Sequence, residues 1–259
     1  MTKCIFNDEW QMLEEVSIGI QSEAIQYGCG LFETMRTYQD RALPFIAEHL
    51  NRLSNSIQKL ELDCAYSSQQ IEAMIQRLVS DSEHELQRIK VLVIPDGVLV
   101  TSHKLDLPVN SDMRLTTSRV SRSLAEHKTT SYMDCQLAWR SAQKRGFDDS
   151  ILIDANDMVT ETGRGNLFWV NNGQIYTRST GVLPGIMRDC VMSLATVTYA
   201  DISINNLQAA DELFVTNSIR GIAPVSAVDD TPFETQDVTT NLQLKLADHI
   251  ANRLQDNSQ

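Results

Sequence analysis

Runs of apolar and β-prone residues mark the first part of the chain. They predict strands at residues 3–7, 31–38 and 42–46. Asp40 and Arg41 lie between the second and third runs and are typical of a tight turn. Residues 31–46 are therefore expected to form a β-hairpin.

The spacing of apolar residues changes to a helical period after residue 48. Leu50, Leu53, Ile57 and Leu60 recur every three or four positions, which predicts a helix over residues 48–60. A polar start followed by apolar residues on one face predicts a second helix over residues 68–80.

Strands and helices are both predicted in the rest of the chain. Pro95-Asp96-Gly97 is a strong turn signal and predicts a hairpin of two strands. The predicted strands are residues 88–94, 97–102, 113–120, 150–154, 166–170, 174–177 and 213–216, and the predicted helices are residues 131–145 and a segment after 185. Because strands and helices do not alternate strictly, the pattern indicates an α+β protein of two lobes and not a doubly wound sheet.

The expected boundary between the two lobes is marked by Pro108, Asn110 and Asp112, three residues that favour turns and loops. It separates a small N-terminal lobe at residues 1–110 from a larger lobe at residues 111–259.

Composition narrows the classes of function. The 259-residue chain has a formal net charge of −12, which argues against nucleic acid and anionic membranes as partners and leaves a small-molecule substrate. No apolar run is long enough to cross a bilayer, and the acidic N-terminal segment is unlike a secretory signal. Five dispersed cysteines are typical of free thiols in a reducing cytosol, so a cytoplasmic protein is expected. The histidines form no ligand pattern, and no metal is expected.

Two basic residues stand where they could bind a cofactor. Arg52 lies at the edge of the apolar stripe of the helix predicted at 48–60, where a guanidinium could grip a phosphate through two hydrogen bonds. Lys128 lies among hydroxyl side chains just before the helix predicted at 131–145. A helix start disfavours a nearby ammonium, and a Schiff-base lysine needs a neutral amine. The alternatives are a surface arginine and an ordinary exposed lysine.

An acidic residue and two loops complete the candidate chemistry. Glu161 lies in a segment of small residues that leads into an apolar strand, where a carboxylate could keep a pyridine nitrogen protonated. Residues 181–188 place Pro184-Gly185 before a helix, so that backbone N–H groups could bind a phosphate. Residues 216–221 follow an apolar strand and carry hydroxyl and amide donors. The alternatives are a solvated loop glutamate and ordinary turn chemistry.

These segments, taken in order, resemble the class-IV aminotransferases, also called fold-type IV enzymes of pyridoxal 5′-phosphate (PLP). The matching stretches span nearly the whole chain and are residues 27–36, 48–53, 127–132, 146–149, 160–168, 182–188 and 216–225. The resemblance implies a D-amino-acid-aminotransferase-like fold. That fold has a small N-terminal α/β lobe, a larger C-terminal α/β lobe that binds PLP, the cofactor in the cleft between them, and a homodimer.

The resemblance also implies roles for particular residues. Lys128 falls at the Schiff-base lysine, and Glu161 falls at the partner of the pyridine nitrogen. The other positions implied to bind the cofactor, chiefly through its phosphate, are Arg52, Asn166, the backbone of Ile186 and Met187, and Ser218.

Within the family, Phe32-Glu33-Thr34 and residues 216–225 look most like those of lyases that convert 4-amino-4-deoxychorismate to 4-aminobenzoate and pyruvate in folate biosynthesis. Thr34 is then a candidate for assisting the lyase step through its hydroxyl. The alternative is a threonine chosen for strand propensity. Two other functions remain open: a class-IV aminotransferase acting on branched-chain or D-amino acids, and a non-catalytic relative. Residues 90–104 contain no arginine, so the Arg-x-His pair typical of D-amino-acid aminotransferases is missing.

Some positions depart from the lyase pattern. Cys29 stands between two glycines where an aspartate is usual, and Ser131 and Tyr132 replace an Asn-Arg pair. The contacts to substrate carboxylates therefore stay open, and the candidate substrate-binding residues are Tyr27, Arg36, Arg164 and Arg220.

Overall fold

The computed structural model describes residues 2–107 and 112–256, and these form two compact units. Unit 1 contains residues 2–107, 127–131 and 253–256, whereas unit 2 contains residues 112–126 and 132–252. Strands and helices are mixed in both units, which confirms the predicted α+β class.

The predicted boundary between residues 110 and 111 lies outside the described residues. The sequence predicts that residues 111–259 form the second lobe, but the structure places two segments of this range in unit 1. Residues 127–131 belong to unit 1 because Phe32 N donates to Lys128 O (2.9 Å) and Thr130 N donates to Gly30 O (2.8 Å). Residues 253–256 belong to unit 1 because Arg253 donates to Pro44 O (2.6 Å).

Unit 1 is built on an antiparallel sheet whose described strands follow the order β2-β1-β5-β4-β3. The strands are β1 (Lys3–Phe6), β2 (Glu9–Met12), β3 (Leu31–Arg36), β4 (Gln87–Ile94) and β5 (Gly97–Lys104). The strands predicted at residues 3–7, 31–38, 88–94 and 97–102 are thereby confirmed, with small differences in their ends.

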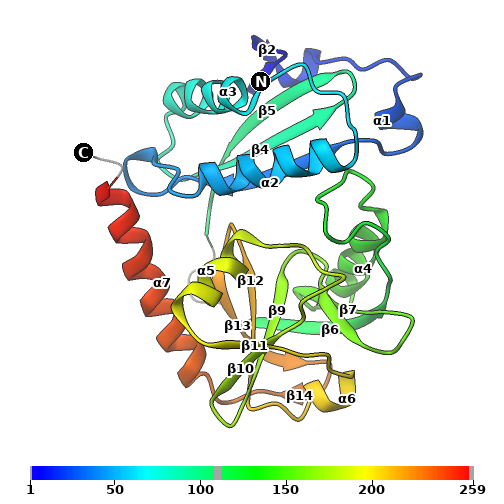
Figure 1. Cartoon of the computed structure of the whole chain (residues 1–259), viewed down its shortest axis with the longest axis vertical. Helices are drawn as coiled ribbons and strands as arrows, with labels where there is room; N and C mark the ends of the chain where they lie inside the picture. The colour runs from blue at the N-terminus through cyan, green and yellow to red at the C-terminus, as the bar shows by residue number, and fades with distance from the viewer. Residues whose placement is uncertain (1, 108–111, 257–259) are drawn as a thin grey trace. The chain divides into compact units, whose positions relative to one another are not determined.

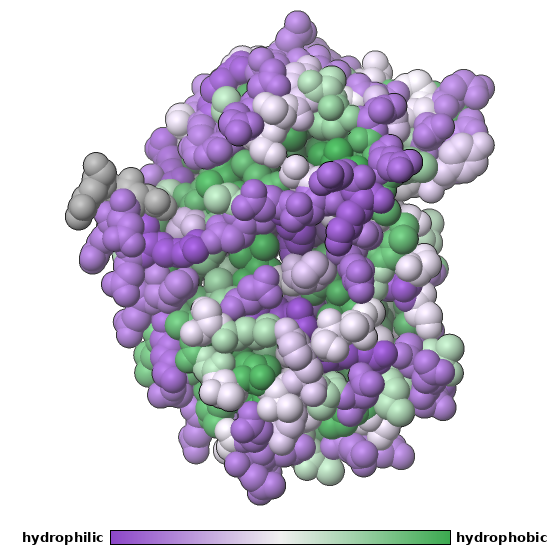
Figure 2. All heavy atoms as spheres, viewed as in Figure 1, coloured by the Kyte–Doolittle hydropathy of each residue, from purple (hydrophilic) through white to green (hydrophobic). Residues whose placement is uncertain are grey.

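Two amphipathic helices, α2 (Ile46–Lys59) and α3 (Ser68–Asp81), pack against this sheet (Figure 1). Leu50 and Leu53 of α2 and Met74 and Ile75 of α3 are buried in one core with the sheet. The outward side of α2 forms a band of hydrophilic side chains (Figure 2). A capping box between Ser67 and Gln70 begins α3 and satisfies backbone donors at its start.

The strand predicted at residues 42–46 is wrong. A short 3-10 helix, η2 (Gln39–Arg41), turns the chain, with Asp40 and Arg41 at positive φ. Residues 42–45 are irregular, and α2 begins at Ile46. Pro44 has no backbone N–H to donate to a neighbouring strand, while Leu43 and Phe45 are buried by packing and not by strand pairing.

Unit 2 is built on a mixed sheet with the order β11-β10-β9-β12-β13-β6-β7-β8 among the described residues, and β14 pairs with β13. The strands are β6 (Met113–Arg119), β7 (Asp149–Ile153), β8 (Val159–Thr162), β9 (Asn166–Asn171), β10 (Gln174–Thr177), β11 (Val197–Tyr199), β12 (Glu212–Asn217), β13 (Gly221–Val228) and β14 (Thr231–Pro232). Phe168 and Phe214 stack in adjacent strands of this sheet with their ring centroids 4.7 Å apart.

Helices flank the sheet of unit 2. They are α4 (Met133–Lys144), α5 (Ile186–Leu194), α6 (Ile204–Leu207) and α7 (Asp237–Asp256), and the short α1 (Glu23–Gln26) lies in unit 1. The buried carboxylate of Glu212 accepts from the backbone N of Val238 and Thr239 (both 2.9 Å) and so caps the start of α7. Among the described residues, no helix combines the length and apolar character needed to cross a membrane.

Candidate functional site

Strand β3 divides its side chains between two faces. Phe32, Thr34 and Arg36 are half-buried, whereas Leu31, Glu33 and Met35 are buried. This alternation follows from the two-residue period of a strand. Each face of β3 carries a separate set of candidate residues.

Lys128 lies beside the half-buried face of β3. Its segment is held by the hydrogen bonds to Phe32 and Gly30 described above and by a bridge between Thr129 and Leu31. The Lys128 Nζ is 4.5 Å from the centroid of the Phe32 ring. Because α4 begins at Met133 and not at residue 131, Lys128 sits in an extended segment. The helix-dipole argument therefore has little force here, since that field falls off within a turn.

A second amine, Lys90, approaches the same ring. Lys90 pairs with Thr34 across β3 and β4, and its Nζ is 5.2 Å from the Phe32 centroid. Burial lowers the pKa of Lys90, and the positive charge of Arg88 lowers it further. Lys90 is not among the residues predicted from the sequence. Its strand register with Thr34 could have identified it, because paired residues of adjacent strands share a face.

The remaining unit 1 candidates occupy different places. The guanidinium of Arg36 lies 4.2 Å from the centroid of the Tyr38 ring. The Tyr27 side chain is 71% exposed at the end of α1. Arg52 lies on α2 and bonds to Glu33, on the buried face of β3. His127 Nδ1 lies 3.0 Å from Ser56 Oγ on α2, one turn after Arg52, so the Lys128 segment contacts the helix that carries Arg52.

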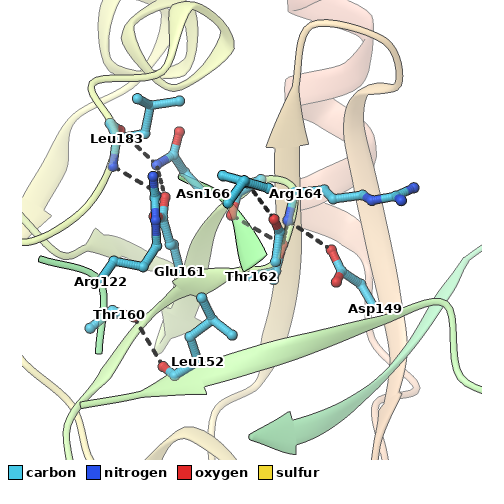
Figure 3. A network of polar contacts seen from close by, with 12 residues as sticks. Arg122, Asp149, Leu152, Thr160, Glu161, Thr162, Arg164, Asn166 and Leu183 are labelled. Atoms are coloured by element: carbon cyan, nitrogen blue, oxygen red, sulfur yellow. Dashed lines mark hydrogen bonds and ion pairs between the residues drawn. The ribbon is translucent and has the colours of Figure 1, made fainter. Parts of the chain in front are cut away.

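In unit 2 the centre of the polar network is Glu161, at 4% exposure on β8 (Figure 3). One carboxylate oxygen forms an ion pair with Arg122. The other accepts from the backbone N of Leu183 (3.1 Å) and from Asn166 Nδ2 (3.3 Å). Asn166 Nδ2 also donates to Leu183 O (2.8 Å). The predicted residues Glu161 and Asn166 are thus brought together.

Arg122 is a member of this network that the sequence analysis missed. Burial acts to lower its pKa, but the charge and hydrogen bond of Glu161, together with the nearby Tyr132 and Cys135, raise the pKa above the usual value. Its guanidinium lies 5.2 Å from the centroid of the Tyr132 ring. The Tyr132 hydroxyl donates to Gly163 O (2.5 Å), and burial raises its pKa. No motif in the sequence singles out Arg122, since its partner is 39 residues away.

An anion cradle lies next to Asn166. Helix α5 begins after Gly185 without a side-chain cap, so the first backbone N–H groups, those of Ile186 and Met187, have no acceptor within the helix. A Cβ on Gly185 would lie 2.0 Å from Asn166 Oδ1, so only glycine lets the backbone come this close. Asn166 pairs with Thr216 across β9 and β12.

The Thr216 side chain is 1% exposed, and its hydroxyl finds no hydrogen-bond partner within the part of the chain that the structure describes. A buried hydroxyl without a partner is costly in a folded protein. Its position across from Asn166 indicates that the cradle suits a ligand with several acceptor oxygens. Ser218 and Arg220 follow in a turn in which Asn217 Oδ1 accepts from Ile219 N (3.0 Å) and Arg220 N (2.9 Å).

Arg164 points away from Glu161 (Figure 3). Its guanidinium lies 3.6 Å from the centroid of the Trp139 ring on α4, and its backbone N donates to Asp149 Oδ2 (3.1 Å). Burial raises the pKa of Asp149. The structure does not group the Arg164 side chain with Glu161 and Asn166.

Comparisons with known proteins extend these observations. A profile of the family described as amino-transferase class IV matches residues 30–228. A D-alanine aminotransferase of Listeria monocytogenes is 24% identical over 256 residues, which cover 88% of each chain.

Two solved structures share the fold. A branched-chain amino acid aminotransferase of Escherichia coli has a TM-score of 0.85 and 22% identity, covering 93% of this chain and 92% of its own. A candidate 4-amino-4-deoxychorismate lyase of Legionella pneumophila has a TM-score of 0.81 and 26% identity, covering 91% of this chain and 96% of its own. These likenesses confirm the predicted fold class and the resemblance on which it rested.

Proposed function

Because the chain belongs to the class-IV aminotransferase family, whose members are enzymes, we propose that it binds PLP and acts as a 4-amino-4-deoxychorismate lyase. The reaction would yield 4-aminobenzoate and pyruvate. The observation that carries the cofactor assignment is the anion cradle of unit 2, with its glycine-dependent approach at Gly185 and its buried Thr216 hydroxyl. The likeness to the candidate lyase of Legionella pneumophila supports the choice of reaction.

The residues of the cradle fit a phosphate monoester. The amides of Ile186 and Met187 would donate to its oxygens at the positive end of α5. The hydroxyls of Thr216 and Ser218 are additional donors, and the guanidinium of Arg52 would supply positive charge. Asn166 would hold the loop at Leu183 in place and so fix the start of α5.

Glu161 would accept a hydrogen bond from the pyridine nitrogen of the cofactor. When bound, the protonated ring supplies an electron sink for the pair left by the substrate Cα–H bond. Arg122 forms an ion pair with one oxygen of Glu161, and an adjacent positive charge favours the charged form of a carboxylate. The acceptor oxygen is oriented by Leu183 N and Asn166.

Lys128 would attach to the aldehyde carbon of the cofactor. The Lys128 amine would also serve as the general base that takes the Cα proton of the substrate. The centroid of the Phe32 ring lies 4.5 Å from the Lys128 Nζ. Thr34 is the candidate for assisting the departure of pyruvate through its hydroxyl.

Lys90 is the best-placed cation for a substrate carboxylate, because it pairs with Thr34 and lies over the same Phe32 ring as Lys128. It joins Arg36, Arg164, Arg220 and Tyr27 as a proposed substrate-binding residue. A partly desolvated ammonium binds a carboxylate more strongly than an exposed one, since water competes less.

We further propose a cytoplasmic homodimer whose only ligands are small molecules. The five cysteines are all free thiols in the structure, which suits a reducing compartment. The acidic net charge of −12 disfavours nucleic acid and anionic membranes as partners.

The second candidate function is an aminotransferase acting on D-amino acids or branched-chain amino acids. The likeness to the D-alanine aminotransferase of Listeria monocytogenes favours it. The same residues would serve that reaction, since both begin with removal of the proton from Cα. A non-catalytic relative is the third alternative.

Incubation of the purified protein with 4-amino-4-deoxychorismate separates these functions. A lyase releases 4-aminobenzoate and pyruvate in equal amounts, and Lys128→Ala releases neither. Transfer of the amino group from D-alanine or leucine to an oxo acid, without 4-aminobenzoate, would instead identify an aminotransferase. Borohydride reduction followed by peptide mapping should place the cofactor on Lys128. A protein that takes up no PLP would be the non-catalytic relative.

A further inference from the structure

A carboxylate occupies a core position of unit 1. Glu33 lies between Leu31 and Met35 on the buried face of β3, and all three are at most 3% exposed. A buried carboxylate is strongly unfavourable unless hydrogen-bonded partners compensate its charge. Its partners therefore indicate why an acidic residue stands at this position.

Helix α2 supplies both partners from one of its faces. Arg52 Nε donates to Glu33 Oε1 (2.8 Å), and Arg52 Nη2 donates to Oε2 (2.7 Å). His49 Nδ1 lies 2.7 Å from Oε2. Burial acts to raise the pKa of Glu33, but the charge of Arg52 and the hydrogen bonds from His49 and Arg52 lower it to about 2. Because an ionised carboxylate only accepts, His49 Nδ1 carries the hydrogen.

The two parallel hydrogen bonds fix the plane of the guanidinium. A planar fork bound through Nε and Nη2 cannot rotate without breaking both bonds. The rest of the guanidinium is then held in one orientation, and the Arg52 side chain is 10% exposed. An arginine without such a partner would lose considerable rotamer freedom on binding an anion.

We infer that Glu33 is a positioning residue, which presents the guanidinium of Arg52 to the cofactor phosphate. The inference rests on the proposed function, in which Arg52 binds that phosphate. A role in stability alone does not explain the arrangement well, because a buried ion pair is often no more stabilising than apolar residues of the same volume.

The test compares binding of PLP with binding of pyridoxal, which lacks the phosphate. Full-length protein freed of cofactor is titrated with each compound and followed by absorbance. Glu33→Asp keeps the charge but moves the carboxylate back by one methylene, so the bidentate geometry is lost. Glu48→Asp on the same helix is the matched control, since Glu48 pairs with Arg253. Arg52→Met reports the contribution of the guanidinium itself.

We expect Glu33→Asp to reduce the preference for PLP over pyridoxal by at least about tenfold, or roughly 1.4 kcal/mol. Affinity for pyridoxal and the preference of Glu48→Asp should stay within about twofold of the wild-type values. A folding defect would weaken binding of both compounds equally, and so leave their ratio unchanged.

An unchanged or increased preference in Glu33→Asp, alongside a lost preference in Arg52→Met, overturns the positioning role and leaves the proposed function intact. If the wild type shows no preference for PLP, the proposed function itself fails. Should Glu33→Asp not fold, Glu33→Gln is judged by the same ratio.

Discussion

Each unit holds a buried carboxylate paired with an arginine, and the two pairs differ in how the carboxylate oxygens are bound. In unit 1 both oxygens of Glu33 are bound by side chains of a single helix. In unit 2 one oxygen of Glu161 forms an ion pair with Arg122, while the other accepts bonds of 3.1 and 3.3 Å from Leu183 N and Asn166. Because these two bonds are longer than those that Glu33 accepts, we expect this oxygen of Glu161 to accept from a ligand.

This difference separates two uses of the same pair. We propose that in unit 1 the carboxylate orients the arginine, and that the arginine binds the ligand. For unit 2 we propose the reverse, in which the arginine holds the carboxylate and the carboxylate binds the ligand. Substitution of Glu33 should therefore change stability and phosphate preference, whereas substitution of Glu161 should change turnover.

The largest effect is expected when Glu33 is removed. Glu33→Ala removes the carboxylate that compensates the charge of Arg52, whose side chain is only 10% exposed, and this should lower the free energy of unfolding by about 3–5 kcal/mol. Chemical denaturation of the cofactor-free protein measures this loss of unfolding free energy. Glu48→Ala is the control, since its pair with Arg253 is about one-third exposed and should contribute less than about 1 kcal/mol. Equal losses in the two variants would contradict the claim that the buried Glu33–Arg52 pair contributes more to stability than the more exposed Glu48–Arg253 pair.

The contribution of the Glu33–Arg52 pair to stability should also be measurable in the wild type at acid pH. The pKa of Glu33 falls from 4.5 to about 2 on folding, so its stabilising effect is complete above pH 4.5 and is lost as the pH falls toward 2. The shift corresponds to about 3 kcal/mol. Unfolding free energies measured between pH 6 and pH 2 should therefore decline less steeply in Glu33→Gln than in the wild type. Parallel declines would show that other carboxylates dominate.

In unit 2 the expected loss is one of rate. Glu161→Gln removes the charge that keeps a pyridine nitrogen protonated, and kcat should fall by roughly 100-fold, as for loss of one preorganised electrostatic contact. Glu212→Gln is the matched control, since Glu212 is also a buried unit 2 carboxylate, but it caps α7. If both variants lose activity equally, the effect belongs to folding and not to the site.

Local sequence patterns predicted most elements, because those elements have clear periods. The stripe from Leu50 to Leu60 identified α2, and the turn at Pro95-Asp96-Gly97 identified the hairpin of β4 and β5. Helix α7 was not identified, since Leu242, Leu244 and Leu246 alternate like a strand. In the structure Leu242 and Leu246 are buried, while Leu244 is 63% exposed.

The candidate site was predictable only where its chemistry is local. Glu161, Asn166 and Leu183 form one network, and all three lie in segments that the sequence motifs cover. Arg122 and Lys90 could not be found in this way, since Arg122 meets its partner across the fold and Lys90 depends on the strand register with Thr34. The resemblance to a family supplied the roles, which no spacing in this chain specifies.

The smallest effect is expected from a substitution that tests whether unit 2 binds phosphate through backbone N–H groups and not through a charged side chain. A Cβ added in Gly185→Ala would meet Asn166 Oδ1 at 2.0 Å, so either the start of α5 or the Asn166 amide that holds Leu183 must shift. The strain of such overpacking is typically about 1–3 kcal/mol, and we expect PLP affinity to fall by about tenfold. Gly19→Ala is the control, since nothing lies within 4 Å of its added Cβ. Gly185→Ala leaves every charge in place. If its PLP affinity equals that of Gly19→Ala, the amides of Ile186 and Met187 do not bind the phosphate. Arg52 and the hydroxyls would then bind it alone.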